Sequence, residues 1–427
     1  MTAGPLAGIR VLEFSQIVAA PFLGCILSDL GADVVKVEPL AGDQHRSWGA
    51  VVPGEGKRFQ SLNRGKRGIA LDLQQPAGRE VIRRLLPAFD VVTNNYRSGV
   101  AERLGIDYAT LRALRPDLIY CEINGWGHAG PIAGDAAADP VVCAYSGLTA
   151  ADAKLGDDGA PLAVSCAAIS DYAAGFSAAI GVLAALYHRA LTGEGQLVEA
   201  SLLRSALAIQ DTTVMREPVA DATLRDPMLA AVHSIRTRGG AYREVIAARA
   251  GQRMSDTAAL KGFNSAYETA DGVLWLGAVT PKNRNAVRAL LGITDDRAES
   301  PDFDASDPAS IAYGDRRKAH IAQQLRTRTT YEWFEAFRAA GVPVAPVQLP
   351  EEMADDPQVV ANGFMTPLVH PITGPQQVAS PVVTLSATPT AVRKPSPTLG
   401  EDTTALLAEA GFTPAEIAAL RASDVAF

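Results

Sequence analysis

Residues 9–37 read IRVLEFSQIVAAPFLGCILSDLGADVVKV, and this stretch decides the fold. Ile9–Phe14 is a short apolar run that ends in a polar turn, and Ala20–Leu30 has helical spacing that stops at Gly31. Asp33–Val37 is rich in β-branched residues, which is typical of a buried parallel strand. A strand, a helix and a second strand of these lengths predict a right-handed βαβ unit.

The alternation continues beyond this unit. Further strands are predicted at Gly68–Leu73, Asp90–Thr93 and Leu118–Glu122, and helices at Pro76–Leu86 and 170–190. Val198–Ser205 begins a strand or a helix of the same domain. Strands separated by helices of this length predict an α/β fold with a doubly wound parallel sheet.

The second half of the chain has a different pattern. Residues 215–262 show weak periodicity and are interpreted as a connector into a smaller domain. Thr269–Ala278 predicts a hairpin that turns at Asp271-Gly272. The remaining elements are helical runs at 282–291 and 314–340, a helix end and strand at Ala339–Val347, strands at Gly363–Val369 and Gln377–Val382, and a helix pair at 401–421.

The composition of the chain limits its possible domain number, partners and location. A chain of 427 residues predicts two domains, and 48% hydrophobic with 20% charged residues is typical of a globular protein with a large core. The net charge of −8 argues against nucleic acid and anionic membranes as partners. The N-terminus lacks the pattern of a signal peptide, and Tyr172–Tyr187 is short for a membrane span and is interpreted as a buried core helix. A cytoplasmic location is therefore expected.

Cysteines and histidines indicate no metal site. The cysteines lie singly in apolar surroundings and form no CxxC pair, at Cys25, Cys121, Cys143 and Cys166. The histidines show neither HxH nor HExxH spacing, so zinc is not expected. His128, in the loop GWGHAGP, is placed where a ligand could lie, although an ordinary loop histidine is the simpler interpretation.

Nucleotide motifs are missing from the sequence. It has no Walker A motif and no GxGxxG after the first strand, which argues against ATP and NAD. Basic residues instead stand near the ends of predicted strands, at Lys36, Lys66, Arg67, Arg97 and Arg103. Together they are suited to a nucleotide with a 3′-phosphate and a pyrophosphate, while for each alone an ordinary surface cation is the simpler interpretation.

Asp171 is the candidate nucleophile. Ser170 is a plausible N-cap, which places Asp171 in the first turn of a helix that is small and apolar on all sides. The helix macrodipole is expected to keep the carboxylate ionised, as attack on a thioester requires. The alternative is an ordinary first-turn acid that only stabilises the helix.

Long stretches of the sequence resemble the class III CoA-transferase family, which includes formyl-CoA and carnitine CoA-transferases and α-methylacyl-CoA racemases. The resemblance rests on GIRVLEFSQIVAAPFLGCILSDLGADVVKVEPLAGDQHRSWG, LNRGKRGIALDLQQPAGREVIRRLLPAFDVVTNNYRSGVAERLGIDYATL, DYAAGFSAAIGVLAALYHRALTGEGQLVEASLL, AAGVPVAPVQLPEEMADDPQVVANGF and PSPTLGEDTTALLAEAGF. It covers most of residues 5–205 and 328–420.

The resemblance implies an activity and its site. CoA would move from an acyl-CoA donor to a carboxylic acid acceptor through an aspartyl anhydride and an aspartyl-CoA thioester formed on Asp171. CoA is then a co-substrate, and no cofactor is bound permanently. The residues implied to contact CoA or to line its path are Gln16, Val18, Ala19, Lys66, Arg103 and Asp139.

The resemblance also implies an organisation of the chain. Residues 1–214 and 328–427 would form a discontinuous large CoA-binding α/β domain, and 215–327 a connector with a smaller inserted α+β domain. Two such chains would form an interlocked homodimer. The partners expected of the protein are thus an acyl-CoA, an organic acid and a second copy of itself.

Three other functions remain as alternatives. An acyl-CoA racemase or epimerase would act at the α carbon and needs two proton-transfer groups, but Ala138 stands where racemases of the superfamily carry histidine. A non-catalytic CoA-binding scaffold would bind CoA without exchange. The third alternative is a nicotinamide dehydrogenase, but the sequence lacks the glycine fingerprint of that class.

The sequence also contains a group of basic residues in the segment interpreted as a connector. This group, at Arg236, Arg238, Arg243 and Arg249, either holds a distal carboxylate of the substrate or is a surface cluster.

Overall fold

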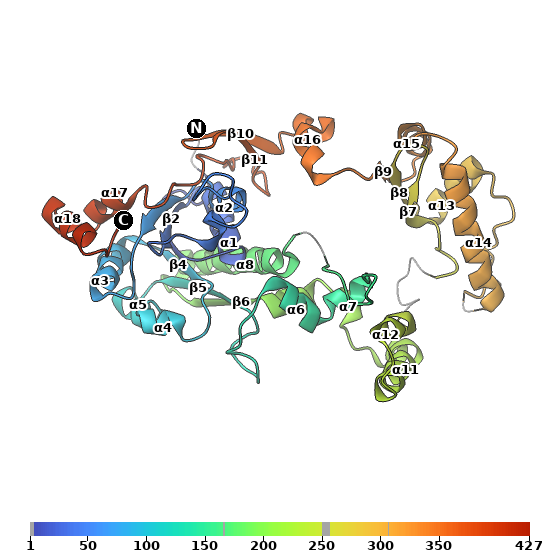
Figure 1. The fold of residues 1–427 in the computed structure, drawn as a ribbon, viewed down its shortest axis with the longest axis horizontal. Coiled ribbons are helices and arrows are strands. Elements are labelled where there is room, and N and C mark those ends of the chain that lie inside the picture. The colour runs from blue at the N-terminus through green and yellow to red at the C-terminus, as the bar shows by residue number, and fades with distance from the viewer. Residues whose placement is uncertain (1–3, 165–166, 250–256, 306) are drawn as a thin grey trace. The chain divides into compact units, whose positions relative to one another are not determined.

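A computed structural model describes residues 4–164, 167–249, 257–305 and 307–427. Its largest element is a six-stranded sheet in the order β3-β2-β1-β4-β5-β6, in which every neighbouring pair is parallel (Figure 1). The strands are β1 (Arg10–Phe14), β2 (Asp33–Glu38), β3 (Arg67–Ala70), β4 (Val91–Asn94), β5 (Ile119–Asn124) and β6 (Leu197–Ser201). The predicted parallel sheet is confirmed, and its strand order reverses between β1 and β4.

Both faces of this sheet are covered by helices. Neighbouring residues of β1 enter different cores, because Val11 packs with α1 (Ala19–Asp29) and α8 (Ile169–Thr192), whereas Leu12 packs on the opposite face. The opposite core includes residues of α3 (Pro76–Leu85), α17 (Thr403–Glu409) and α18 (Pro414–Ala422). Strands buried on both faces must be apolar throughout, which explains their contiguous β-branched runs.

The first compact unit contains residues 1–156, 161–215 and 356–427, so both ends of the chain contribute to it. Its other elements are η1 (Gln44–Arg46), α2 (Lys57–Asn63), η2 (Leu86–Ala88), α4 (Val100–Leu104), α5 (Tyr108–Leu114), α6 (Asp139–Ser146), α7 (Leu148–Asp152), α9 (Leu202–Ala208), η3 (Asp211–Thr213), α16 (Pro357–Ala361) and the antiparallel hairpin of β10 (Met365–His370) and β11 (Gly374–Ala379). Val198–Ser205, for which a strand or a helix was predicted, contains parts of both, since β6 ends at Ser201 and α9 begins at Leu202.

The second compact unit contains residues 157–160 and 216–355. Its antiparallel sheet, in the order β7-β8-β9, packs beside helices. Its elements are α10 (Pro218–Ala220), η4 (Asp221–Arg225), α11 (Asp226–Thr237), α12 (Tyr242–Ala248), β7 (Asn264–Glu268), β8 (Val273–Gly277), α13 (Pro281–Leu291), α14 (Pro308–Leu325), α15 (Thr330–Ala339), β9 (Val344–Pro346) and η6 (Pro350–Asp355). The predicted hairpin is present and turns at residues 269–272, but its first strand, β7, ends at Glu268 and so precedes the predicted range.

Three expectations for this region differ from the structure. The segment interpreted as a connector contains the helices α11 and α12, and the helical run at 314–340 is two helices, α14 and α15. The unit ends at residue 355 and not at 327, because β9 pairs with β8 and Phe337 of α15 lies in the same core.

The central helix α8 is not buried on all sides, contrary to expectation. One face packs on α1 and the sheet, while large apolar side chains on another face are exposed, at Phe176, Ile180, Leu183, Tyr187 and Leu191. By length and composition alone, α8 is the one helix in the described residues that could cross a membrane. Since its packed face belongs to the core of the first unit, we interpret it as a core helix.

Candidate active site

A cavity of about 890 Å³ lies at the carboxyl ends of the strands, where the order reverses between β1 and β4. Open α/β sheets bind their ligands at this position. The loop after β1 contributes Gln16, Ile17 and Val18 to the wall, and the loop after β4 contributes Asn95 and Arg97. All of its lining residues belong to the first unit.

The loop after β1 is strained and held in place. Ile17 has φ of 71°, a conformation that is costly for a β-branched residue and that is found at functional sites. The side chain of Asn95 accepts a hydrogen bond from the Gln16 N–H at 3.0 Å and donates one to the Gln16 carbonyl at 2.8 Å. Helix α1 begins directly afterwards, and its N-cap, Val18, offers no side-chain hydrogen bond. The first N–H groups of α1 are therefore free of a side-chain cap beside the cavity.

Asp171 and Asp139 meet in the wall of this cavity. The N-cap of α8 is Ala168 and not Ser170 as expected, so Ser170 lies inside the first turn. One carboxylate oxygen of Asp139 accepts hydrogen bonds from the Ser170 N–H at 2.7 Å, the Ser170 hydroxyl at 2.6 Å and the Asp171 N–H at 3.3 Å. Asp139 thus caps α8 from the start of α6, a function that a local N-cap serves in other helices.

The protonation of Asp171 differs from the expectation. Burial and, to a lesser extent, the neighbouring charge of Asp139 together raise its pKa from 3.8 to about 7, against the opposing charge of Arg58. A helix dipole stabilises an anion by only about 0.3–1 kcal/mol at an exposed site, which is too little to offset this desolvation. Near neutral pH Asp171 therefore exists in both its protonated and its ionised forms.

Five of the seven predicted site residues line this cavity, namely Gln16, Val18, Ala19, Asp139 and Asp171. Lys66 does not, because its ammonium is fully buried and donates hydrogen bonds to Glu13, Asn63 and the Pro21 carbonyl at 2.8–2.9 Å. Arg103 is exposed outside the cavity and donates to the Gly99 carbonyl. In this structure neither side chain faces Asp171, and their contact with CoA stays a prediction.

Two other basic residues near strand ends are also structural. Lys36 pairs with Asp43 at 3.1 Å and is fully buried, and Arg67 pairs with Asp33 and Glu409. Glu13 of β1 stands opposite Lys36 of β2 in the sheet register, so their charges lie on the same face. Burial of these cations requires their ion pairs, which explains why they do not reach the cavity.

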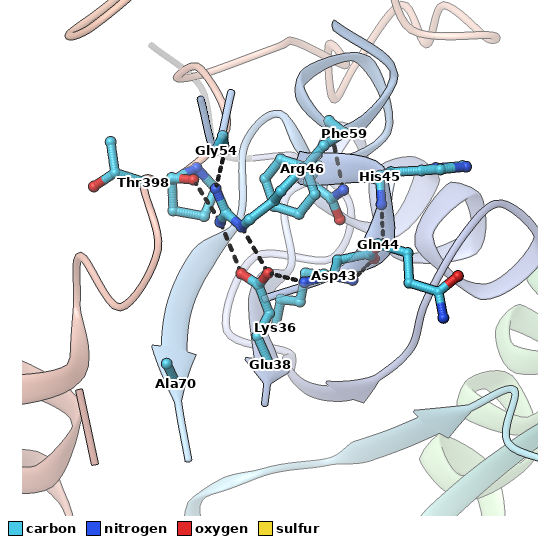
Figure 2. Close-up of polar contacts among 12 residues, drawn as sticks. Lys36, Glu38, Asp43, Gln44, His45, Arg46, Gly54, Phe59, Ala70 and Thr398 are labelled. Carbon is cyan, nitrogen blue, oxygen red and sulfur yellow. Dashed lines mark hydrogen bonds and ion pairs between the residues drawn. The ribbon is translucent and has the colours of Figure 1, made fainter. Parts of the chain in front are cut away.

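The loop after β2 contributes residues that the sequence analysis did not single out. Arg46 binds both carboxylate oxygens of Glu38, at 2.7 and 2.8 Å, and the Pro397 carbonyl at 3.0 Å (Figure 2). Its neighbour His45 extends in the opposite direction (Figure 2). His45 lines the cavity, and its ring makes an edge contact with Trp48. His45 follows the carboxyl end of β2, and this position in the sequence could have identified it as a candidate site residue.

Arg58 is a further cavity residue that the sequence analysis missed. It lies in the first turn of α2, is exposed, and makes no ion pair or hydrogen bond with the described residues. Its charge acts on both Asp171 and His45. Arg58 is thus a free cation close to the candidate nucleophile.

The remaining candidate residues are possible metal ligands, His128 and the cysteines. No group of three metal-ligating side chains exists among the described residues. His128 pairs with Glu199 at 2.8 Å and contacts the cavity residue Asn124 at 3.0 Å, but does not itself line the cavity. Cys25, Cys121 and Cys143 are buried free thiols, and Cys166 lies outside the described residues.

Comparison with known proteins identifies the family. The model of CoA-transferase family III matches residues 6–403. The chain belongs to CoA-transferase family III. The succinate–glutarate CoA-transferase of Agrobacterium fabrum is 33% identical over 95% of both chains. The human succinyl-CoA:glutarate CoA-transferase is 29% identical over 95% of this chain and 86% of its own length.

Solved structures agree with this assignment to family III. A crystal structure of Rv3272 from Mycobacterium tuberculosis matches with a TM-score of 0.74 and 26% identity, over 95% of this chain and all of that one. A CaiB/BaiF family protein from Brucella suis matches with a TM-score of 0.73 and 27% identity, over 96% of this chain and 100% of that one. The chain is therefore an enzyme of CoA-transferase family III.

Proposed function

We propose that the protein transfers CoA from an acyl-CoA to a carboxylic acid through covalent intermediates on Asp171. The carboxylate attacks the thioester carbonyl, the C–S bond breaks, and a mixed anhydride and CoA thiolate form. The thiolate attacks the aspartyl carbonyl, which releases the donor acid and leaves aspartyl-CoA. The acceptor carboxylate repeats the two steps in reverse order, and Asp171 is regenerated. Thioester energy is conserved, so no ATP is needed.

The placement of Asp171 carries this proposal. It stands in a cavity at the switch point of the sheet, next to the strained loop at Ile17 and the uncapped start of α1. Free backbone N–H groups beside a reacting carbonyl stabilise the negative charge that develops on its oxygen. A pKa of about 7 makes the ionised carboxylate more basic, and so more nucleophilic, than an ordinary aspartate, while part of it is still ionised near neutral pH.

For CoA, we propose that Gln16, Val18 and Ala19 lie along the thioester, with Asp139 beside them. The support is their common position in the cavity wall. The proposed contacts of Lys66 and Arg103 with CoA come from resemblance alone. Arg97, an exposed cation in the cavity wall, is a further candidate for a phosphate contact.

The named relatives suggest which acids are exchanged. They include transferases for succinate and glutarate, for oxalate in Acetobacter aceti and for L-malate in Chloroflexus aurantiacus. We propose that the acceptor is a small organic acid and that the donor is the CoA thioester of another acid of similar size. A racemase is not favoured, because these relatives are transferases and Ala138, the N-cap of α6, carries no proton-transfer group.

We further propose that the protein acts as a homodimer, interlocked as in the family it resembles, and in the cytoplasm. The exposed apolar face of α8 supports a partner chain, because an uncovered stripe of five large apolar side chains is unusual for a monomer. The buried free thiols of Cys25, Cys121 and Cys143 are compatible with a reducing compartment.

Trapping of the intermediate tests the mechanism. The protein is mixed with succinyl-CoA, quenched with hydroxylamine and digested, and the peptide that contains residue 171 is analysed by mass spectrometry. An aspartyl hydroxamate at Asp171 in the wild type, absent from Asp171→Asn, supports the proposal. Exchange of CoA without any adduct at residue 171 contradicts it. Deuterium uptake at the α carbon without an acceptor acid indicates a racemase instead.

A further inference from the structure

His45 is a buried polar side chain without a full set of partners. Its exposure is 1%, and neither ring nitrogen has a hydrogen bond of good geometry with the described residues. The backbone of Ile17 also acts on the imidazole, but one carbonyl satisfies at most one ring N–H. A buried polar group left unpaired is costly, so His45 is explained best if a ligand in the cavity supplies its partner.

Arg58 adds a positive charge to the same part of the cavity. Its charge acts on His45, Asp171 and Tyr172, which places it near the reaction centre. Arg46 is neutralised by Glu38 and Arg64 by Asp29, whereas Arg97, also in the cavity wall, has no ion pair with the described residues. Arg58 has no such acid among the described residues.

The charge of the cavity determines what this cation can recognise. Asp139 and Asp171 already line the wall, so an acid that brings a second carboxylate adds to a negative site. Such a substrate needs a compensating cation, and guanidinium binds carboxylate with two parallel hydrogen bonds. A neutral imidazole donates one further hydrogen bond to the same group.

We propose that Arg58 and His45 form a carboxylate subsite, which makes the enzyme select acids that carry a second carboxylate at the end remote from the thioester. This inference rests on the proposed function, since it defines the acid that Asp171 receives. It differs from the basic group at Arg236 and its neighbours, where Arg238 is already paired with Glu244 in the second unit.

Matched acids test the subsite. Exchange is measured with succinate, its monomethyl ester and butyrate as acceptors, for the wild type, Arg58→Gln and His45→Asn. The matched control is Lys57→Gln, which removes the neighbouring exposed cation of α2 that does not line the cavity. We expect the wild type to prefer succinate by roughly tenfold or more in kcat/KM, as loss of a charged hydrogen bond predicts.

Arg58→Gln is expected to remove most of this preference by raising KM for succinate far more than KM for butyrate. Because loss of the Arg58 charge also raises the pKa of Asp171, kcat should fall by a similar factor for both acids. His45→Asn should reduce the preference in part, and Lys57→Gln should leave it unchanged. Equal use of the three acids by the wild type, or an equal loss for all acids in Arg58→Gln, overturns the subsite. So does a weakened binding of desulfo-CoA in Arg58→Gln with unchanged acid selectivity, because Arg58 then binds a phosphate.

Equilibrium binding separates this inference from the proposed function. Binding of labelled succinate and butyrate to the CoA-bound protein is followed by NMR, which does not depend on turnover. If the wild type exchanges no acid but binds succinate selectively through Arg58, the transferase proposal fails and the subsite stands. If exchange occurs without selective binding or turnover of succinate, the subsite fails and the transferase stands.

Discussion

The carboxylate of Asp139 accepts a hydrogen bond from the backbone N–H of Asp171 at 3.3 Å, across 32 residues of sequence. The same oxygen caps the start of α8 through Ser170. Asp139 therefore has two effects on the candidate nucleophile: it fixes the helix end that presents Asp171, and its charge raises the pKa of that residue. The two effects can be separated, because asparagine keeps an acceptor oxygen and loses the charge.

Asp139→Asn is expected to shift the pH dependence of the reaction to lower pH. Burial keeps the pKa of Asp171 raised, but loss of the Asp139 charge removes the second cause, so more of Asp171 is ionised at pH 6. The rate of aspartyl-CoA formation, measured from pH 5 to 8, checks this. Glu102→Gln, an exposed acid outside the cavity, is the control. A midpoint that stays in place or rises contradicts the coupling.

Asp171→Asn is expected to abolish exchange while it stabilises the fold at neutral pH. The folded pKa of about 7 lies above 3.8, so the folded state holds a proton that the unfolded state releases, and stability is lost as pH rises between these values. Asparagine does not ionise, so its contribution to stability does not fall as pH rises. The free energy of unfolding of Asp171→Asn relative to the wild type should therefore increase from pH 4 to 7, by on the order of 1–4 kcal/mol, and then level off.

Urea unfolding at pH 4.5 and pH 8 measures this difference. An advantage that is the same at both pH values would show that the pKa of Asp171 is not raised. Near wild-type exchange by Asp171→Asn would refute the covalent mechanism, whatever the stability.

Local patterns predicted the sheet well and the site only in part. Strands β1 to β5 lie within a few residues of their predicted positions, because a strand buried on both faces must be a contiguous apolar run. The N-cap of α8 was wrong because the true cap, Asp139, comes from another helix. Such a partner leaves no trace in the neighbouring sequence.

Lys66 illustrates the same limit for charges. A basic residue beside a strand end can face the cavity or enter the sheet, and the sequence around it does not distinguish the two. The distant Glu13 decides the outcome, since it needs a cation inside the core. The sequence does not distinguish His45, in the loop after β2, or Arg58, in the first turn of α2, from ordinary surface residues, because neither belongs to a recognisable motif.

Lys66→Met is expected to destabilise the protein by about 3–5 kcal/mol, because it leaves Glu13 buried without its closest cation. Weaker binding of CoA by the folded variant would support the predicted contact of Lys66 with CoA. Arg103→Ala gives the complementary result if its predicted contact is correct, with weaker CoA binding and unchanged stability. Urea unfolding and calorimetric titration with CoA measure the two quantities. A Lys66→Met protein that binds CoA with wild-type affinity contradicts the predicted contact.

Gly24→Ala should also destabilise the core around Glu13. An added Cβ at Gly24 would lie 1.6 Å from a carboxylate oxygen of Glu13 and 3.1 Å from the Lys66 side chain, so the buried ion pair must shift. Overpacking of this kind costs about 1–3 kcal/mol. Gly134→Ala is the control, since nothing lies within 4 Å of its added Cβ. Thermal unfolding compares the two variants, and equal melting temperatures would show that the ion pair adapts without cost.

Ile180→Glu is expected to disrupt the proposed homodimer. Ile180 is 70% exposed in the centre of the apolar face of α8, and burial of one such side chain at an interface contributes about 1.5–3 kcal/mol. A charge there opposes association, because it would be buried without a partner. Val51→Glu, at a loop residue that is 97% exposed, controls for the loss of an apolar side chain. Sedimentation velocity should show a dimeric wild type and Val51→Glu, and a monomeric Ile180→Glu. A monomeric wild type, or a variant that remains dimeric, means that the apolar face of α8 has another function.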